Sequence, residues 1–270
     1  MGNPCFDSPL VMGVLNVTPD SFSDGGLYLD HDAAVAHGLE MVEQGAGIID
    51  VGGESSRPGA APVTEAVELG RVIPVVEALS PHVRVSVDTV KPAVAIAALG
   101  AGATMVNDIS SSLWEVAAGR AAWVAVHMQG SPATMQVAPH YDDVVAEVFG
   151  FVLDRARVAL AAGVHEVFVD PGIGFGKTVD HNLSLLHHLP QLVADAAAAG
   201  CAGVVVGTSR KRFLGVLAAP AASAQPLDVD DRFEGSLATA VVAMVAGAAV
   251  VRVHDVAATV QSARLYGPAA

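Results

Sequence analysis

The chain has 270 residues, 52% of them hydrophobic, and a mean hydropathy of +0.49, so it can bury a large core in one large domain or two small ones. Its formal net charge of −14 and sequence pI near 4.9 argue against a nucleic-acid partner, because surfaces that bind nucleic acid are basic. Its two cysteines, Cys5 and Cys201, are too few for a disulfide framework and lack metal-ligand spacing, which favours a reducing cytoplasm.

Membrane and secretory signals are missing from the sequence pattern. Gly, Asp, His or Arg interrupts every apolar run before it reaches the roughly 18 residues of a membrane span. The first residues carry no basic segment, so we expect no secretory signal peptide. No linker-like stretch divides the chain. We therefore expect a cytoplasmic protein without a membrane partner, folded as a single domain over residues 1–270.

One pattern recurs along the chain: an apolar, β-rich run, then a polar or glycine-rich loop, then an alanine-rich amphipathic stretch. The apolar runs predict strands at Val11–Asn16, Ile48–Val51, Val83–Asp88, Met105–Asp108, Trp123–His127, Val167–Asp170, Val204–Gly207 and Val250–Val253. The amphipathic stretches predict helices at Asp32–Gln44, Val63–Leu79, Pro92–Leu99, Asp142–Ala162, Leu183–Ala199, Phe233–Val245 and Val256–Leu265.

Strands that alternate with helices pair in parallel, and eight such units predict an α/β fold of the (β/α)8 TIM-barrel type. A doubly wound open sheet is the alternative fold. The fourth unit has room for only a short helix, which Ser112 and Glu115 would open as a capping box. Ala218–Asp230 is rich in Ala, Pro, Ser and Asp and is expected to be a mobile loop.

Polar residues gather where the predicted strands end. A (β/α)8 barrel carries its chemistry at the C-terminal ends of its strands. Strand termination alone explains part of this set, but not its mixture, with carboxylates and amides in the middle of the chain and cations at the end. The residues at or just beyond the strand ends are Asn16, Asp50, Asp88, Asn107, Asp108, His127, Asp170, Ser209, Arg252 and His254.

The stretch Phe168–Thr178 reads F-V-D-P-G-I-G-F-G-K-T, an apolar run that ends in a carboxylate and continues as a glycine-rich loop. Pro171 removes a backbone donor and stops the strand directly after Asp170. The glycines let the backbone approach a ligand, and Lys177 adds a cation at the loop exit. An ordinary Asp-Pro-Gly turn with a satisfied carboxylate is the alternative interpretation. Either Asp180 or Asn182 would cap the following helix.

Eight motifs follow one another along the chain, most of them at the ends of predicted strands. They are L-N-V-T-P-D-S-F-S-D-G-G (Leu15–Gly26), D-V-G-G-E-S-S-R-P-G (Asp50–Gly59), V-S-V-D-T (Val85–Thr89), V-N-D-I-S (Val106–Ser110), H-M-Q-G (His127–Gly130), D-P-G-I-G-F-G-K (Asp170–Lys177), G-T-S-R-K-R-F-L-G (Gly207–Gly215) and R-V-H-D (Arg252–Asp255). Together these motifs resemble those of the dihydropteroate synthase family, the pterin-binding TIM barrels. The resemblance implies an enzyme, a transferase of folate biosynthesis, that joins 6-hydroxymethyl-7,8-dihydropterin diphosphate to p-aminobenzoate and releases pyrophosphate.

The resemblance implies a role for each catalytic residue. Asp170 takes the place of the family's pterin carboxylate, which can accept two adjacent N–H donors as it would from arginine. Asn107 and Asp88 match residues that read other pterin heteroatoms. Lys211 resembles the lysine that reaches the pterin carbonyl region, and Arg252 can stack on the ring while it faces the anion. For each charge, a buried structural ion pair is the alternative.

The diphosphate and the aryl amine have their own implied contacts. Arg252 and His254 alternate along one strand end, so both can face the diphosphate. By resemblance, Asn16 helps to hold Mg²⁺, the expected cofactor. The resemblance also implies that Phe175 and three loop residues wall the aryl ring, while Ser209 opens a helix whose start, with Lys211, attracts the benzoate carboxylate. The three loop residues are Ser56, Arg57 and Pro58.

The reaction needs no protein nucleophile, because family knowledge favours a path in which the C–O bond breaks first and the pterin delocalises the charge. Two loops, Thr18–Asp30 and Gly52–Pro62, are expected to order when ligands bind. The late helices are apolar enough for the homodimer that the family usually forms. Two alternatives stay open: a pterin-dependent methyltransferase, and a non-catalytic homologue, suggested by the short fourth unit and by Ser111 and Ser112.

Overall fold

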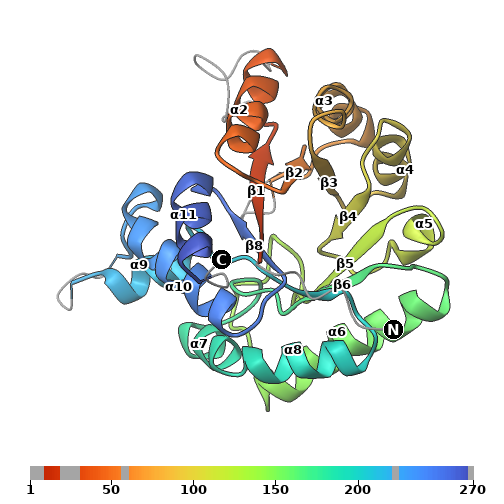
Figure 1. Ribbon diagram of the computed structural model, residues 1–270. Helices are drawn as coiled ribbons and strands as arrows, with labels where there is room; N and C mark the ends of the chain where they lie inside the picture. The colour runs from red at the N-terminus through yellow and green to blue at the C-terminus, as the bar shows by residue number, and fades with distance from the viewer. Residues whose placement is uncertain (1–8, 19–30, 56–60, 221–224, 267–270) are drawn as a thin grey trace.

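The computed structural model describes residues 9–18, 31–55, 61–220 and 225–266 of the chain (Figure 1). Eight parallel strands form a closed barrel in the order β1 to β8, so the predicted TIM barrel is confirmed and the open sheet is wrong. The strands are β1 (Leu10–Asn16), β2 (Ile48–Gly52), β3 (Arg84–Asp88), β4 (Met105–Asp108), β5 (Ala122–Val126), β6 (Val167–Asp170), β7 (Gly203–Val206) and β8 (Val250–Val253).

Helices surround the barrel as an outer ring, as Figure 1 shows. No helix in the described part of the chain is long and apolar enough to span a membrane. The helices are α2 (His31–Glu43), α3 (Glu65–Leu79), α4 (Pro92–Gly100), α5 (Trp114–Ala117), α6 (Val144–Ala161), α7 (Val179–His187), α8 (Leu189–Ala198), α9 (Arg212–Ala218), α10 (Phe233–Val245) and α11 (Val256–Tyr266), with a 3-10 turn, η1 (Val229–Arg232), between α9 and α10.

Each strand is buried on both faces, because its side chains alternate between the barrel interior and the layer under the helices. The outer layer is a continuous apolar core that includes Trp123, Val169 and Val251. The interior is filled by a smaller cluster in which the bulky side chains are Met12, Ile48, Met105 and Phe168. The interior is therefore a packed core, and only its ends are open to polar chemistry.

The N-terminal end of the barrel is closed by an ion pair. Arg84, the first residue of β3, donates from Nη1 and Nη2 to the two carboxylate oxygens of Glu166, at 3.0 and 2.6 Å. Glu166 directly precedes β6, so the pair links two strands that are not neighbours in the barrel. A bidentate guanidinium–carboxylate contact fixes both side chains. This pair is a structural clamp at the end of the barrel opposite the predicted site.

The prediction of one helix over Leu183–Ala199 is wrong, because the structure has two helices, α7 and α8, that meet at His188. Pro190 lies in the first turn of α8, where its missing N–H costs nothing, but it could not continue α7. The cap is also different from the prediction. Thr178 accepts a hydrogen bond from the backbone N–H of His181, and the His181 ring answers in a capping box.

The fourth unit is short as predicted, since α5 spans four residues, but the predicted capping box is wrong. Asp108 organises this turn instead, because its Oδ2 accepts from the backbone N–H groups of Ser112 and Leu113, each at 2.7 Å. The Trp123 indole N–H donates to the same oxygen at 3.2 Å. Asp108 is thus fully satisfied by its own loop and by β5.

The loop predicted over Ala218–Asp230 is only partly described. Residues 221–224 lie outside the described part, so the predicted mobility is untested. Its last two residues open η1, which the prediction missed. Arg232 holds this segment by donating from Nε and Nη2 to the Leu227 carbonyl, at 3.0 and 2.6 Å.

Candidate active site

A polar layer lies at the C-terminal end of the barrel, directly above the apolar interior. Strand pairing aligns Asn16 with Gly52, Gly52 with Asp88, and Asp88 with Asn107. These residues therefore stand at one height on the rim. Side chains two positions apart on a strand point to the same face, so a polar residue two positions after an interior apolar residue also points inward. This places four polar residues on the inward face: Asp50 after Ile48, Asn107 after Met105, Asp170 after Phe168 and Arg252 after Val250.

Arg252 lies at the centre of one half of this layer. Its Nε donates to Asp50 Oδ2 at 2.6 Å and its Nη2 donates to Asp88 Oδ2 at 2.8 Å. Asn107 Nδ2 donates to the same Asp50 oxygen at 3.0 Å. The structure therefore brings together three of the predicted catalytic residues, with Asp50 between them.

Two carboxylates share one guanidinium in this cluster, and the pKa of Asp88 is shifted as a result. Burial raises the pKa of Asp88 to about 7, Arg252 opposes the rise, and the negative charge of Asp50 adds to it. The two carboxylates raise the pKa of Arg252 above its ordinary value even though burial acts against its charged form. Arg252 is thus a permanent cation, and Asp88 is the member of the cluster that titrates near neutral pH.

Asp170 faces the barrel interior from β6. Its Oδ1 accepts from the Gly172 backbone N–H at 2.7 Å, which is the turn contact of the alternative interpretation. Among the described residues, Oδ2 accepts no hydrogen bond and is left for a ligand. Burial raises the pKa of Asp170, and the positive charge of Lys211, the Gly172 N–H and Arg252 oppose that rise. Lys211 and Arg252 are therefore close enough to act on this carboxylate.

Lys211 and Phe175 meet beside Asp170. The Lys211 ammonium donates to the Ile173 carbonyl and lies 4.2 Å from the centroid of the Phe175 ring. Its methylene chain covers Gly174, where an added Cβ would lie 2.7 Å from Lys211 Cδ. Burial lowers the pKa of Lys211 to about 8, while Asp170 favours the charged form. A cation, a carboxylate and an aromatic face thus converge on one point of the rim.

The loop between β6 and α7 is held from outside by side chains that the sequence did not single out for this role. Gln136 donates to the Gly174 carbonyl at 2.7 Å, and Tyr141 donates its hydroxyl to the Gly176 carbonyl at 2.8 Å. Asn182, predicted as a helix cap, instead accepts from the Gly174 N–H at 2.7 Å. The carbonyl groups of all five residues from Gly172 to Gly176 accept a hydrogen bond, so the wall that carries Phe175 is preorganised.

Lys177 is the loop's buried cation, with 4% of its surface exposed. Its ammonium donates to the Phe175 carbonyl and to His127 Nδ1, each at 3.0 Å. Burial lowers the pKa of Lys177 to about 7, with Lys211 adding repulsion, and burial lowers the pKa of His127 to about 3. His127 is therefore a neutral acceptor that supports the loop.

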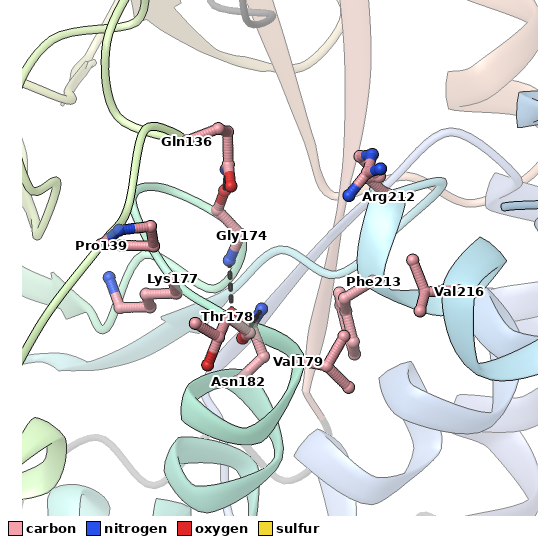
Figure 2. A pocket seen from close by; sticks show the side chains of 10 residues that line it. All are labelled: Gln136, Pro139, Gly174, Lys177, Thr178, Val179, Asn182, Arg212, Phe213 and Val216. Carbon is pink, nitrogen blue, oxygen red and sulfur yellow. Dashed lines mark hydrogen bonds between the residues drawn. The ribbon is translucent and has the colours of Figure 1, made fainter. Parts of the chain in front are cut away.

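A cavity of about 220 Å³ lies on the outer side of this loop, as Figure 2 shows. Gln136 and Pro139 line it from the segment before α6, and Arg212, Phe213 and Val216 line it from α9. The dashed line in Figure 2 marks the Asn182–Gly174 hydrogen bond that forms the inner wall. The exposed Arg212 therefore lies across this cavity from the β6–α7 loop that carries Phe175.

Ser209 and His254 form a pair at the neighbouring strand ends. The Ser209 hydroxyl lies 3.0 Å from His254 Nδ1 and accepts from the His254 backbone N–H at 3.2 Å. An oxygen that accepts from that N–H can donate its own proton to Nδ1, which leaves the neutral ring protonated at Nε2. Ser209 thus orients His254, and its predicted contact with substrate stays a prediction.

Asn16 stands beside Gly52 and Asp88. A Cβ on Gly52 would lie 3.5 Å from Asp88 Cβ and 3.9 Å from Asn16 Oδ1, so the glycine keeps the space next to the amide open. The described residues contain no cluster of three His, Cys, Asp or Glu side chains able to hold a metal. Ser56, Arg57 and Pro58, and most of the two loops expected to order on binding, lie outside the described residues.

Comparison with known proteins agrees with this geometry. The family model described as pterin binding enzyme matches residues 12–254, which reach from β1 to the residue just past β8. The chain belongs to the pterin binding enzyme family. The match covers β1 from Met12 onward, all of β2 to β8, and every polar residue of the rim described above.

Individual pterin binding enzymes are similar over nearly the whole chain. The Mycobacterium leprae dihydropteroate synthase is 47% identical over 271 residues, which cover 95% of this chain and 92% of the relative. The Xanthomonas albilineans dihydropteroate synthase with 4-aminobenzoic acid has a TM-score of 0.85, 45% identity, and coverage of 96% and 92%. The same enzyme in complex with 7,8-dihydropteroate has a TM-score of 0.82 and 43% identity, and the match covers 96% of this chain and 93% of that one.

Proposed function

We propose that the chain is a dihydropteroate synthase, which condenses 6-hydroxymethyl-7,8-dihydropterin diphosphate with p-aminobenzoate to give 7,8-dihydropteroate and pyrophosphate. The observation that carries this proposal is the convergence of Asp170, Lys211 and Arg252 on one rim, with Asp170 and Lys211 for the ring and Arg252 for the leaving group. Relatives described with 4-aminobenzoic acid and with 7,8-dihydropteroate support the same substrates.

The pterin would enter the polar layer with its guanidine-like edge toward Asp170. The free Oδ2 of that carboxylate can accept one N–H, and Oδ1 can take a second beside the Gly172 contact. Asn107 on β4 and Asp88 on β3 stand on the same rim, where they can bind the other heteroatoms. Lys211 would donate to the ring carbonyl in exchange for its present contact with the Ile173 carbonyl.

The chemical step needs stabilisation of charge at both ends of the breaking C–O bond. Asp88 and Asp170 supply negative potential beside the methylene as positive charge develops there. Arg252 and the Nε2–H of His254 supply donors for the departing diphosphate. The amino group of p-aminobenzoate then attacks the methylene carbon and loses one proton, so no covalent protein intermediate is required.

Magnesium is the proposed cofactor, and the residues fit it. Mg²⁺ binds through one or two protein oxygens together with phosphates and retained waters, so a single amide at an open position suffices. Asn16 Oδ1 next to Gly52 would be that ligand. The bound ion would neutralise charge on the diphosphate. Removal of Mg²⁺ with a chelator should weaken binding of the diphosphate substrate more than binding of p-aminobenzoate.

The aryl amine would lie against Phe175 on the preorganised loop. The Lys211 ammonium 4.2 Å from that ring provides positive charge beside the aryl site, and Arg212 adds a second cation at its edge. Ser56, Arg57 and Pro58 are proposed to close the other side. Because loop contacts fix Phe175 before binding, most of the cost of ordering this wall is already met in folding.

Pyrophosphate release on mixing both substrates with Mg²⁺ tests the proposed function. A dihydropteroate synthase releases one pyrophosphate for each dihydropteroate formed. A non-catalytic homologue binds the pterin diphosphate without release. A pterin-dependent methyltransferase instead transfers a methyl group from methyltetrahydrofolate to a corrinoid protein, and that result would replace the proposal.

A homodimer through the late helices is also proposed. On α10, Ala238, Val242 and Val245 follow one another at helical spacing on the exposed face, and Val242 and Val245 are 48% and 60% exposed. On α11, Leu265 is 90% exposed. Light scattering after size-exclusion chromatography should give twice the chain mass, and Val245→Asp should shift it toward the monomer. A monomeric wild-type protein would reject the proposal.

A further inference from the structure

Asp50 is a fully buried carboxylate whose position the proposed function does not explain. It is 0% exposed, and it lies two residues before Gly52, deeper in the barrel than the Asp88 layer. Its Oδ2 accepts both Arg252 Nε at 2.6 Å and Asn107 Nδ2 at 3.0 Å. Arg252 is on β8 and Asn107 is on β4, four strands apart in a closed barrel of eight. One oxygen atom therefore links side chains from opposite walls.

We propose that Asp50 is a positioning residue, which fixes the Arg252 guanidinium and the Asn107 amide in the orientations that bind the two halves of the pterin diphosphate. The inference rests on the proposed function, because it assigns those two halves to Arg252 and Asn107. Asp50 itself lies below the layer that would contact substrate.

The contact with Arg252 leaves one edge of the guanidinium for the ligand. Nε and Nη2 face Asp50 and Asp88, and Nη1 makes no hydrogen bond within the described residues. In the proposed function Asp88 binds the pterin ring, and turning toward that ring would leave Arg252 with one carboxylate fewer. Asp50 keeps the guanidinium in place through that exchange, because it is too deep to reach the ligand.

The contact with Asn107 decides which end of the amide faces the ligand. An ionised carboxylate only accepts hydrogen bonds, so the NH₂ group of Asn107 must point toward Asp50. The amide carbonyl then points away from Asp50 and is available to accept an N–H from the pterin. With a neutral side chain at position 50, both orientations of the Asn107 amide become possible, and this selection is lost.

Asp50 is also a poor choice for stability alone. Its second oxygen, Oδ1, and the hydroxyl of Ser86, which is aligned with Asp50 on β3, are buried without a hydrogen-bond partner among the described residues. Unpaired buried polar atoms destabilise a fold. The cluster of Asp50, Asp88 and Arg252 has two carboxyl groups for one cation, and the negative charge of Asp50 contributes to the raised pKa of Asp88. Asp50→Asn should therefore preserve or raise the melting temperature while it lowers activity.

The chain offers a matched control in Asp108. It is also a 0% exposed carboxylate at a strand end, but it accepts only from its own loop and from Trp123. Asp108→Asn should lower the melting temperature, because it weakens the α5 cap, and should leave ligand affinities near wild type. The two variants thus predict opposite patterns of stability and binding.

The test uses two probes in calorimetric titrations of the full-length protein with Mg²⁺ present: 7,8-dihydropteroate, which reports the ring site, and inorganic pyrophosphate, which reports the anion site. Asp50→Asn should weaken the affinity for each probe by about tenfold, because the Asn107 amide and the Arg252 guanidinium lose the carboxylate that orients them. In an Asn107→Ala background, Asp50→Asn should add little to the loss for dihydropteroate but should still weaken pyrophosphate, since coupled residues are not additive.

Equal affinities in Asp50→Asn and wild type, or fully additive losses of dihydropteroate affinity with Asn107→Ala, would overturn the positioning role. So would a parallel fall in melting temperature and in both affinities for Asp50→Asn, which indicates a structural role. Failure of the proposed function has a different signature, because the wild-type protein would then bind neither probe and release no pyrophosphate from the two substrates.

Discussion

The two halves of the barrel mouth hold their functional groups by different means. On the side of β2, β3 and β8, side chains hold one another through ion pairs, with Arg252 between Asp50 and Asp88. On the side of β6, a backbone loop is held by side chains from outside, and the Phe175 ring lies on that loop beneath the Lys211 ammonium. The first half can exchange partners with a charged ligand, whereas the second half keeps a fixed shape.

The largest effect is expected from Lys211→Ala, which removes the cation that faces both halves. Loss of a preorganised charge at the reacting centre costs about a thousandfold in kcat/KM, as seen for similar electrostatic contacts. Pyrophosphate release with both substrates measures it. Arg157→Ala is the control, because Arg157 is an exposed α6 cation that pairs with the exposed Asp154 of the same helix, and it should leave the rate unchanged. A modest loss in Lys211→Ala would show that Arg252 alone organises the mouth.

Gly172→Ala should break the fixed half. Gly172 has φ of 64°, and an added Cβ would lie 1.8 Å from the His127 carbonyl oxygen, so the loop must move. Strain and overpacking together should lower the free energy of unfolding by about 3 kcal/mol, measured by urea denaturation. Gly70→Ala is the control, since a Cβ there meets nothing within 4 Å and the residue lies in α3. Wild-type stability in Gly172→Ala would mean that the loop is not held as described.

The exchangeable half should respond to pH. Asp88 acts as a carboxylate, and its pKa is raised to about 7, so the protonated fraction grows as pH falls through 7. We expect kcat/KM for the pterin diphosphate to fall about tenfold for each pH unit well below that value, because a protonated carboxyl no longer pairs with Arg252 or accepts from the ring. Assays at saturating p-aminobenzoate measure the profile. A flat profile down to about pH 5.5 would contradict the shift.

The smallest effect is expected from Lys177→Met, which tests the fixed half without adding strain. Methionine keeps the length of the side chain but loses the donors to the Phe175 carbonyl and to His127. The KM for p-aminobenzoate should rise about threefold to tenfold because Phe175 loses one anchor, with little change in kcat. Because burial disfavours the ammonium, the melting temperature should not fall. A drop in kcat with unchanged KM would place Lys177 in the chemistry instead.

Local pattern was enough to predict the barrel and the rim. The alternation of apolar and polar residues in β2, β4, β6 and β8 already places Asp50, Asn107, Asp170 and Arg252 on the inward face. The same parity, applied to Asp108, places it outward, and its role in the α5 turn could have been found from the sequence. The break at His188 also had a visible signal in Pro190, which the continuous apolar periodicity concealed.

Other features depend on contacts that no local pattern contains. Lys177 contacts His127, which lies 50 residues earlier in the chain, so the sequence around either residue does not predict the pair. Asp50 was marked as a strand-end carboxylate, but its function as a shared acceptor depends on strands four apart in the closed barrel. Closure of the barrel brings residues that are distant in sequence close together, and the folded structure determines which of them are in contact.

The clamp between Arg84 and Glu166 has a consequence for how this protein can change over generations. It secures the barrel at the end away from the mouth, and the packed layer of Met12, Ile48, Met105 and Phe168 separates the two. Substitutions of ligand-facing side chains at the rim can therefore alter ligand preference and leave this ion pair unchanged. Selection for a different ligand can therefore change the mouth of the barrel while the end with Arg84 and Glu166 stays the same.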